Sequence, residues 1–300
     1  MIAVDPYDSG NFGLLGIDGV SDRNTHTATA SRARDASFDS AIIGNSTAML
    51  LDPVELSRAT GLRFVQLAVT GSGPHEQFPV LDFFLRHHPR VGALVVVTDP
   101  SWCVHESAAP WTGFPYWLYG NSSLRYATRL MSWPAIEHGF QRVSIGLGLS
   151  KRSDPAGAFN PDDVWPQGAF YASNPPKDPP PVATIAGRDN FPEVARLDEL
   201  VKTLAADVAV VLVVPPTFAT TVPQPGTAIA ADRAACNAAL RRIVTGRPRS
   251  NFIDYRIDNA ITRDRANFVD FIHYRPGVSS RILAGIAASI ELGNAAGIDF

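Results

Sequence analysis

Short apolar segments alternate with longer amphipathic segments along most of the chain. The short segments are rich in valine and isoleucine, and the longer ones carry apolar residues at helical spacing. This alternation is typical of a parallel sheet covered by helices on both faces. Strands are therefore expected at 40–43, 64–68, 93–97, 208–214 and 251–254. Helices are expected at 47–60, 74–88, 122–138, 188–206, 230–245 and 277–292.

The pattern predicts a three-layer, doubly wound α/β fold with a five-stranded parallel sheet of the flavodoxin-like kind. Residues 1–36 are polar and weakly patterned, so we expect an N-terminal extension before a single domain at 37–300. The segment 104–186 breaks the alternation and is rich in tryptophan and proline. We expect an insertion that covers the carboxyl edge of the sheet as a lid or cleft wall. The alternative is an insertion whose aromatic residues only pack on the sheet edge.

Composition and charge narrow the classes of function. The chain has 300 residues, 45% of them hydrophobic, which is enough to bury one large core. The formal net charge of −3 is spread without long runs of one sign, so nucleic acid is not an expected partner. A membrane-spanning helix needs roughly 18 to 20 uninterrupted apolar residues, and the sequence contains no such run.

Cysteine and histidine spacing gives no sign of a metal site. Cys103 and Cys236 are too few and too far apart in the sequence to indicate a disulfide framework or a zinc site. We expect two buried free thiols, and a disulfide between them stays open as the alternative. His105 and His138 lack ligand spacing to a carboxylate or a cysteine, so no metal and no cofactor is predicted.

Two short motifs carry the candidate chemistry. Gly44-Asn45-Ser46 directly follows the apolar run 41–43, which places the Ser46 hydroxyl at the carboxyl edge of a buried strand. Near the other end, His273 supplies a base and Asp270 a carboxylate that can orient it. Such triads are assembled in space, so the separation along the chain is no obstacle. The motifs predict a nucleophilic serine site, and the alternative is that Ser46 only caps a helix.

These motifs resemble sequence blocks of the SGNH or GDSL hydrolases. The segments 42–46 (Ile-Ile-Gly-Asn-Ser), 67–71 (Leu-Ala-Val-Thr-Gly) and 270–273 (Asp-x-x-His) stand in the order of the first, second and last blocks of that family. The resemblance spans about residues 37–290, and 274–276 (Tyr-Arg-Pro) follows the last motif as in the family. Within the superfamily the chain is most similar to bacterial surface proteins with an amino-terminal membrane anchor, and more distantly to polysaccharide O-acetyltransferases.

The resemblance implies a role for each residue of the site. Ser46 would be the nucleophile, His273 the general base and Asp270 the group that orients the imidazole. The backbone N–H groups of Ser46 and Gly71 would form the oxyanion hole. The family also implies export to the periplasm or cell surface, with any membrane contact made through an anchor that precedes Met1. A cytoplasmic location is the alternative.

The chain departs from the family pattern at two places. The middle residue of the first motif is Asn45 where the family has aspartate, which leaves the proton-transfer groups intact. The third block, Gly-x-Asn-Asp, is absent, and 97–100 reads Val-Thr-Asp-Pro instead. The side-chain amide that completes the oxyanion hole in the family is therefore missing. The residues expected to line the pocket, some of which could supply the third donor, are Asn45, His75, Thr98, Asp99, Ser101 and Trp102.

The sequence thus predicts a serine esterase or O-acyltransferase that acts on an acylated carbohydrate or small ester through an acyl-serine. Hydrolysis and transfer are not distinguished, because both pass through the same intermediate. The alternative is a carbohydrate-binding or scaffold protein of the cell envelope that has kept the fold and lost efficient catalysis. A nucleotide or flavin binder is not expected, since Gly71-Ser72-Gly73 is too short to cradle phosphates.

Overall fold

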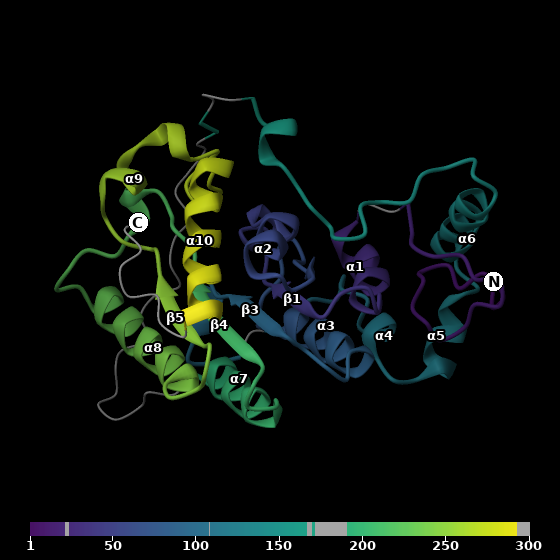
Figure 1. Ribbon diagram of the computed structural model, residues 1–300, viewed down its shortest axis with the longest axis horizontal. Coiled ribbons are helices and arrows are strands. Elements are labelled where there is room, and N and C mark those ends of the chain that lie inside the picture. Colours follow the sequence, from purple (N-terminus) through teal and green to yellow (C-terminus); the bar gives the residue numbers. More distant parts are fainter. Residues whose placement is uncertain (22–23, 108, 167–169, 172–190, 293–300) are drawn as a thin grey trace.

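The computed structural model describes residues 1–21, 24–107, 109–166, 170–171 and 191–292, and contains a sheet between two layers of helices (Figure 1). The five strands run parallel in the order β2-β1-β3-β4-β5. Their bounds are β1 Ser40–Ile43, β2 Phe64–Gln66, β3 Ala93–Val97, β4 Ala209–Val214 and β5 Asn251–Asp254. The predicted three-layer α/β fold is therefore confirmed. Strand order reverses between β1 and β3, which is where ligand sites form in such sheets.

Both faces of the sheet are buried, because successive side chains of a strand point to opposite faces. On one face Ile42 and Val95 pack in a cluster with Leu56 and Ile286. On the other face Ile43 and similar residues meet a second set of helices. The first set of helices is α2 Pro53–Thr60 and α10 Pro276–Leu292, and the second is α3 Pro74–His87, α7 Pro192–Thr203 and α8 Ala228–Val244 (Figure 1).

Two of the predicted helices divide into shorter elements. The predicted helix 47–60 divides into a 3-10 turn, η1 Ala48–Leu50, and α2, because Pro53 starts a new helix that Asp52 caps through the N–H of Val54. The predicted helix 122–138 divides in the same way, since Ser132 caps a new helix. Its two parts are α5 Ser123–Arg129 and α6 Trp133–Gly146. Residues 188–190 of the predicted helix 188–206 lie outside the described residues.

The N-terminal residues 1–36 contain a helix that belongs to the core. In α1 Thr25–Ala33, Ala30 and Ala33 are fully buried in the apolar cluster that includes Ile43. Asp8 accepts a hydrogen bond from Ser31 Oγ at 2.6 Å. These contacts attach the predicted extension to the sheet domain.

The helical part of the insertion packs against α3 and these N-terminal residues. Helix α4 Tyr116–Tyr119 lies beside α3, and α5 and α6 lie with the N-terminus at one end of the molecule, apart from the sheet (Figure 1). The Trp117 ring meets that of Tyr7 with centroids 5.3 Å apart. Helices α4, α5 and α6 of the predicted insertion 104–186 therefore do not form a lid over the sheet. Residues 108, 167–169 and 172–186 of the predicted insertion lie outside the described residues.

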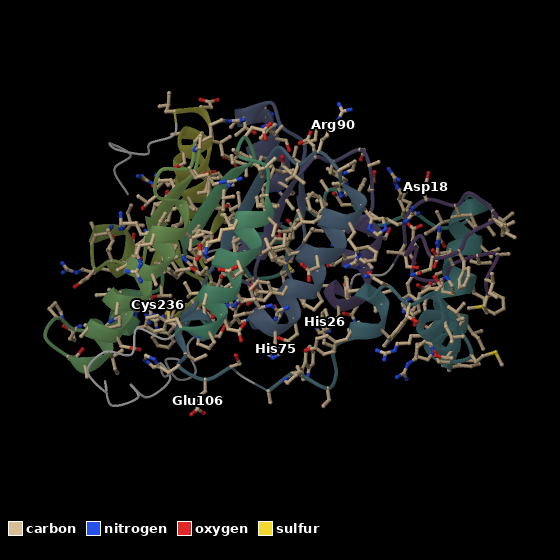
Figure 2. All side chains as sticks on the ribbon, turned by 90° about the horizontal axis from the view of Figure 1, so that it is seen from below. Asp18, His26, His75, Arg90, Glu106 and Cys236 are labelled. Carbon is tan, nitrogen blue, oxygen red and sulfur yellow. A yellow bond between two sulfur atoms is a disulfide. The ribbon has the colours of Figure 1, made fainter. Side chains whose placement is uncertain are left out.

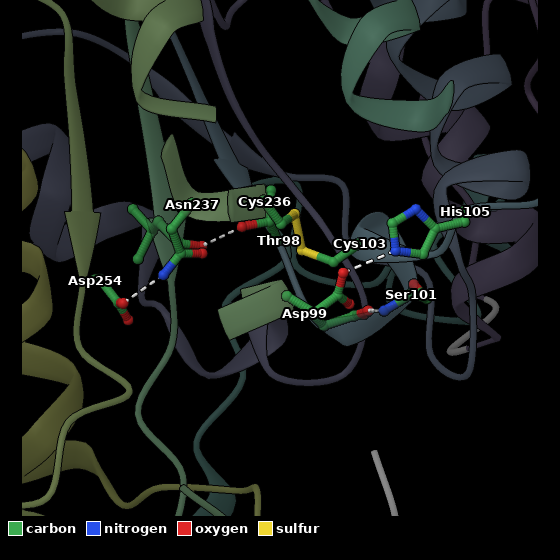
Figure 3. The surroundings of a disulfide bond; sticks show 10 residues. Thr98, Asp99, Ser101, Cys103, His105, Cys236, Asn237 and Asp254 are labelled. Carbon is green, nitrogen blue, oxygen red and sulfur yellow. Dashed lines mark hydrogen bonds and ion pairs between the residues drawn. A yellow bond between two sulfur atoms is a disulfide. The ribbon is translucent and has the colours of Figure 1, made fainter. Parts of the chain in front are cut away.

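Cys103 and Cys236 form a disulfide, so the expectation of two free thiols is wrong (Figure 3). The 3-10 turn η2 Pro100–Cys103 follows β3 and packs against α8, which brings the two Cα atoms to 5.6 Å. That separation lies in the usual range for a disulfide. The separation of 133 positions along the chain concealed this proximity in the sequence. In the described part of the chain, no helix is both long enough and apolar enough to cross a membrane.

Replacing both cysteines, Cys103→Ser with Cys236→Ser, is expected to lower the free energy of unfolding by about 2–5 kcal/mol, because the cross-link restricts the unfolded chain. Denaturant unfolding monitored by circular dichroism measures the change. A reducing agent should have a similar effect on the wild type and none on the double variant. Equal unfolding midpoints for the oxidised and reduced wild type would contradict the prediction.

Candidate active site

Ser46 lies in the turn between β1 and η1, at the carboxyl edge of the sheet. Close packing explains the glycine before it, because a Cβ atom on Gly44 would lie 2.6 Å from Ala48 Cβ. The side chain of Asn45 stabilises the turn, since its Oδ1 accepts hydrogen bonds from the N–H of Thr47 at 3.0 Å and from Thr47 Oγ1 at 2.8 Å. The local sequence thus holds the serine in a fixed position.

The structure brings Ser46, His273 and Asp270 together. His273 Nε2 lies 2.9 Å from Ser46 Oγ, and His273 Nδ1 lies 2.7 Å from Asp270 Oδ2. An ionised carboxylate only accepts hydrogen bonds, so Nδ1 carries the proton and Nε2 is free to accept the serine hydroxyl. This is the arrangement of a Ser-His-Asp triad.

Asp270 is held as an anion by its own loop. Its Oδ1 accepts hydrogen bonds from the N–H groups of Ile272 and His273, both at 2.8 Å. Burial by itself raises the pKa of the Asp270 carboxyl, but the hydrogen bonds from the His273 ring and the backbone outweigh burial, so the pKa lies below its usual value. The charge can therefore stabilise an imidazolium during catalysis.

Neighbours of His273 tie its loop to the rest of the site. The buried hydroxyl of Tyr274 donates a hydrogen bond to the carbonyl of Thr47 at 2.7 Å. Arg275 Nη1 pairs with Asp162 Oδ1 at 2.6 Å, which anchors the segment of the insertion that contains Trp165. The ring of Trp165 then stacks on His273 with centroids 6.2 Å apart. Trp165 is thus the insertion tryptophan that contacts the triad.

Gly71 lies in the loop after β2, where the resemblance places an oxyanion donor. Its φ of +70° is in the left-handed region, which glycine adopts without strain. The preceding residue, Thr70, is held by Thr25 and His26 at the start of α1. Both belong to the N-terminal segment, and the sequence analysis missed them because nothing in the local pattern links that segment to the loop.

The residues after β3 do not replace the missing amide donor in an obvious way. Asp99 accepts a hydrogen bond from Asn45 Nδ2 and another from the N–H of Ser101 at 2.6 Å, so its carboxylate is directed to these groups. Burial raises the pKa of Asp99, and the hydrogen bonds from Ser101 and the positive charges of Arg233 and Arg256 offset this only in part.

Of the other predicted pocket residues, three have buried side chains and one lies at the start of α3. Thr98 and Trp102 are each 1% exposed, so neither side chain lines an open pocket as predicted. The Ser101 hydroxyl is also buried, because the turn η2 folds it towards Gly73. His75 lies in the first turn of α3, half-buried, and Figure 2 shows it on the same edge of the molecule as His26. Among the candidates after β3, Asp99 is therefore the residue in contact with the serine turn.

A groove of about 800 Å³ begins beside the Gly71 loop. Its lining residues include Met49, Ala68 and Thr70 and, from the insertion, Phe159 and Val164. These residues adjoin the site in sequence, since Thr70 precedes Gly71 and Val164 precedes the tryptophan that stacks on His273. The charged and amide residues that line the groove are Asn24, Arg32, Gln66, Lys151, Arg152, Asp154, Asn160 and Asp163. The groove is thus a candidate binding cavity next to the Gly71 loop.

Within the described residues, no cluster of three or more His, Cys, Asp or Glu side chains is arranged to hold a metal ion. Comparison with protein-family models and with curated sequences finds no match. The resemblance to the SGNH hydrolases therefore rests on the sequence motifs alone.

Tyr274→Phe is expected to reduce the free energy of unfolding by about 0.5–1.5 kcal/mol, because it removes a buried hydrogen bond and leaves the carbonyl of Thr47 with only the N–H of Leu50, at 3.4 Å. The same change should slow the reaction of Ser46 with a fluorophosphonate, since the hydrogen bond joins the serine and histidine segments. Tyr171→Phe is the control, because that residue is 48% exposed. Equal stability and equal labelling rates in Tyr274→Phe and Tyr171→Phe would refute the expectation.

The buried carboxylate of Glu76 stabilises the edge of the site. Glu76 Oε2 accepts a hydrogen bond from the N–H of Gly73 at 3.0 Å, and Oε1 accepts from the N–H of Trp111 at 3.0 Å and from Tyr116 Oη at 2.6 Å. Burial by itself raises the pKa of Glu76, but the bonds from Tyr116, Trp111 and Gly73 dominate and lower it. Glu76 thereby joins the Gly71 loop region to the insertion.

Glu76→Gln is expected to lower the free energy of unfolding at neutral pH by about 1.5–3 kcal/mol, as for hydrogen bonds to a charged group. Because the folded-state pKa is depressed, the wild type holds this advantage above the usual glutamate value of 4.5 and loses it as the pH falls through the folded-state value. Unfolding curves between pH 3 and 7 measure the difference. The exposed residue Glu137 provides the control, Glu137→Gln. A pH-independent difference would count against the prediction.

Proposed function

We propose that the protein is a serine esterase or O-acyltransferase of the SGNH type that acts on an acylated carbohydrate or a small ester. The observation that supports this most directly is the 2.9 Å separation between His273 Nε2 and Ser46 Oγ, with Asp270 on the other ring nitrogen. Hydrogen-bond contact of nucleophile and base, with the base oriented by a third group, is the signature of an activated serine.

In the proposed reaction Ser46 Oγ attacks the acyl carbonyl carbon while His273 Nε2 takes the hydroxyl proton. The tetrahedral oxyanion accepts hydrogen bonds from the N–H groups of Ser46 and Gly71. The bond from the acyl carbon to the alcohol oxygen then breaks, and His273 returns the proton to the leaving alcohol. Water or a sugar hydroxyl next attacks the acyl-serine with the same base, which releases the acid or forms the new ester.

The groove supports a substrate larger than a simple acetate ester. Its volume of about 800 Å³ falls in the range of pockets that bind small molecules. An apolar wall with Phe159 and a rim with Asn24, Asn160 and Asp163 suit a ligand with both apolar ring faces and hydroxyl groups. These are the properties of a carbohydrate carrying an acyl group.

The disulfide supports an exported location. Disulfides form and persist mainly in oxidising compartments such as the periplasm and the cell surface, and they are rare in the reducing cytosol. The Cys103–Cys236 bond is therefore consistent with the cell-envelope location that the family resemblance implies.

A carbohydrate-binding protein without efficient catalysis is the second candidate. The observation that favours it is the pairing of Asp99 with Asn45, because the chain has a carboxylate after β3 where the family has an amide donor. The two functions differ in whether Ser46 reacts with an acyl or phosphonyl electrophile.

Ser46→Ala is expected to lower turnover of p-nitrophenyl acetate and of acetylated xylan by about four to six orders of magnitude, because the nucleophile is lost. Release of p-nitrophenol and of acetate measures the two reactions. Ser144→Ala, which alters a half-buried serine of α6, should retain full activity.

The same proteins are treated with a fluorophosphonate and analysed by mass spectrometry. The expected result is one adduct on Ser46 in the wild type and in Ser144→Ala. Equal turnover in the wild type and Ser46→Ala would overturn the esterase proposal. An unlabelled wild type that binds oligosaccharides would favour the second candidate.

A further inference from the structure

We propose that His26 is a positioning residue for the oxyanion hole, which orients and polarises the peptide group between Thr70 and Gly71. This inference rests on the proposed function, because the N–H of Gly71 is one of the two proposed oxyanion donors. It assigns a role in the reaction to a side chain of the N-terminal segment, outside all the motifs of the sequence.

The contact fixes which nitrogen of His26 carries a proton. His26 Nε2 lies 3.0 Å from the carbonyl oxygen of Thr70. A carbonyl oxygen can only accept a hydrogen bond, so Nε2 must be the donor. His26 therefore donates to the carbonyl group of the very peptide whose N–H belongs to Gly71.

Peptide geometry links this contact to the direction of the Gly71 N–H. In a planar trans peptide the C=O and N–H groups point in opposite directions. A donor bound to the Thr70 carbonyl therefore restrains the Gly71 N–H to point away from His26. A hydrogen bond accepted by the carbonyl also polarises the amide, and consecutive hydrogen bonds strengthen one another by roughly 10–30%. The Gly71 N–H thus becomes a better oriented and stronger donor.

The peptide between Thr70 and Gly71 needs such support because the hydrogen bonds within the loop run from Ser72 to the carbonyl of Val69, on either side of it. Gly71 is exposed, and glycine is the most freely rotating residue. Thr25 provides a second restraint, since its Oγ1 accepts the N–H of Thr70 at 3.1 Å and bonds to Thr70 Oγ1 at 2.9 Å. Two consecutive side chains of α1 thereby bind both backbone groups of Thr70.

His26 is itself held in place by the insertion. Its ring meets the ring of Trp111 edge to face, with centroids 4.8 Å apart, and that of Phe114 at 6.3 Å. The hydroxyl of Tyr119 donates to the carbonyl of His26 at 2.7 Å. Asn24 caps the helix by accepting the N–H of His26 at 2.9 Å. These contacts fix the imidazole before a substrate arrives.

A matched pair of variants separates the donor from the ring. His26→Phe keeps an aromatic ring against Trp111 and Phe114 but removes the donor. His26→Gln gives up the ring and restores a donor, because the glutamine amide nitrogen lies about as far along the side chain as Nε2. His87→Phe is the control, since the ring of His87 on α3 bonds to a helix carbonyl, that of Phe83.

Kinetics with p-nitrophenyl acetate provide the main readout. Direct removal of an oxyanion donor costs about 10²–10³ in kcat, so loss of its support should cost less, about 10- to 100-fold. We expect His26→Phe to show this fall in kcat with KM and melting temperature close to wild type. His26→Gln should recover most of the loss, and His87→Phe should match the wild type.

The amide proton of Gly71 gives a second readout that does not depend on turnover. In a ¹⁵N-labelled sample, loss of the hydrogen bond to the Thr70 carbonyl should shift the Gly71 amide resonance in His26→Phe. The resonance should return towards its wild-type position in His26→Gln and should not move in His87→Phe. A purely structural role of His26 would instead lower the melting temperature without this pattern of rescue.

The outcomes distinguish this inference from the proposed function. If the wild type is active and Ser46→Ala is not, but His26→Phe keeps wild-type kcat, the esterase proposal stands and the role of His26 is refuted. A His26→Gln variant as slow as His26→Phe, with an unchanged Gly71 resonance, would also refute it. If the wild type neither turns over esters nor reacts with the fluorophosphonate, the proposed function fails and this inference fails with it.

Discussion

Two hydrogen bonds join segments that are 227 residues apart in the sequence, and the geometry of the site depends on them. One connects His273 Nε2 to Ser46 Oγ, and the other connects the hydroxyl of Tyr274 to the carbonyl of Thr47. The second is buried, so breaking it would leave the Thr47 carbonyl, away from water, with only the longer bond of 3.4 Å from the N–H of Leu50. The bond between Tyr274 and Thr47 therefore holds the two chain segments together at the distance that the bond between His273 and Ser46 requires.

The sheet explains why these segments can meet. Strand order reverses between β1 and β3, so the loops after these strands diverge to opposite sides and leave space at the carboxyl edge. The loop after β5 carries Asp270 and His273 and returns to this edge, because α10 packs against α2 on the same face. Helix packing thus brings the last motif to the first.

The N-terminal segment and the insertion support the site from outside. Together they hold the loop after β2 through Thr25, His26 and Glu76, and the aromatic side chains between them fix the histidine ring. The aromatic residues of this insertion therefore serve mainly to join the insertion to the N-terminal segment. Trp165 differs from the others, since it stacks on His273 at the edge of the groove.

Much of the fold could be predicted from the sequence, because strand and helix periodicity are local properties. The alternation of short apolar and amphipathic segments determined the parallel sheet, and the positions of Ser46, Asp270 and His273 after strands indicated one common edge. Helix boundaries at Pro53 and Ser132 were missed, since a single proline or capping residue divides a helix without changing the apolar pattern.

Tertiary structure alone decided the contacts between segments with no shared pattern. The disulfide, the burial of Thr98 and Trp102, and the contact of His26 with Thr70 each depend on how separate elements pack, which local spacing does not encode. The direction of Asp99 is of the same kind, because its partner Asn45 lies on another strand's loop. The sequence by itself determined the sheet and the chemical groups at its edge. Packing across the chain decided which of those groups meet, since only close contact in three dimensions fixes distance and orientation.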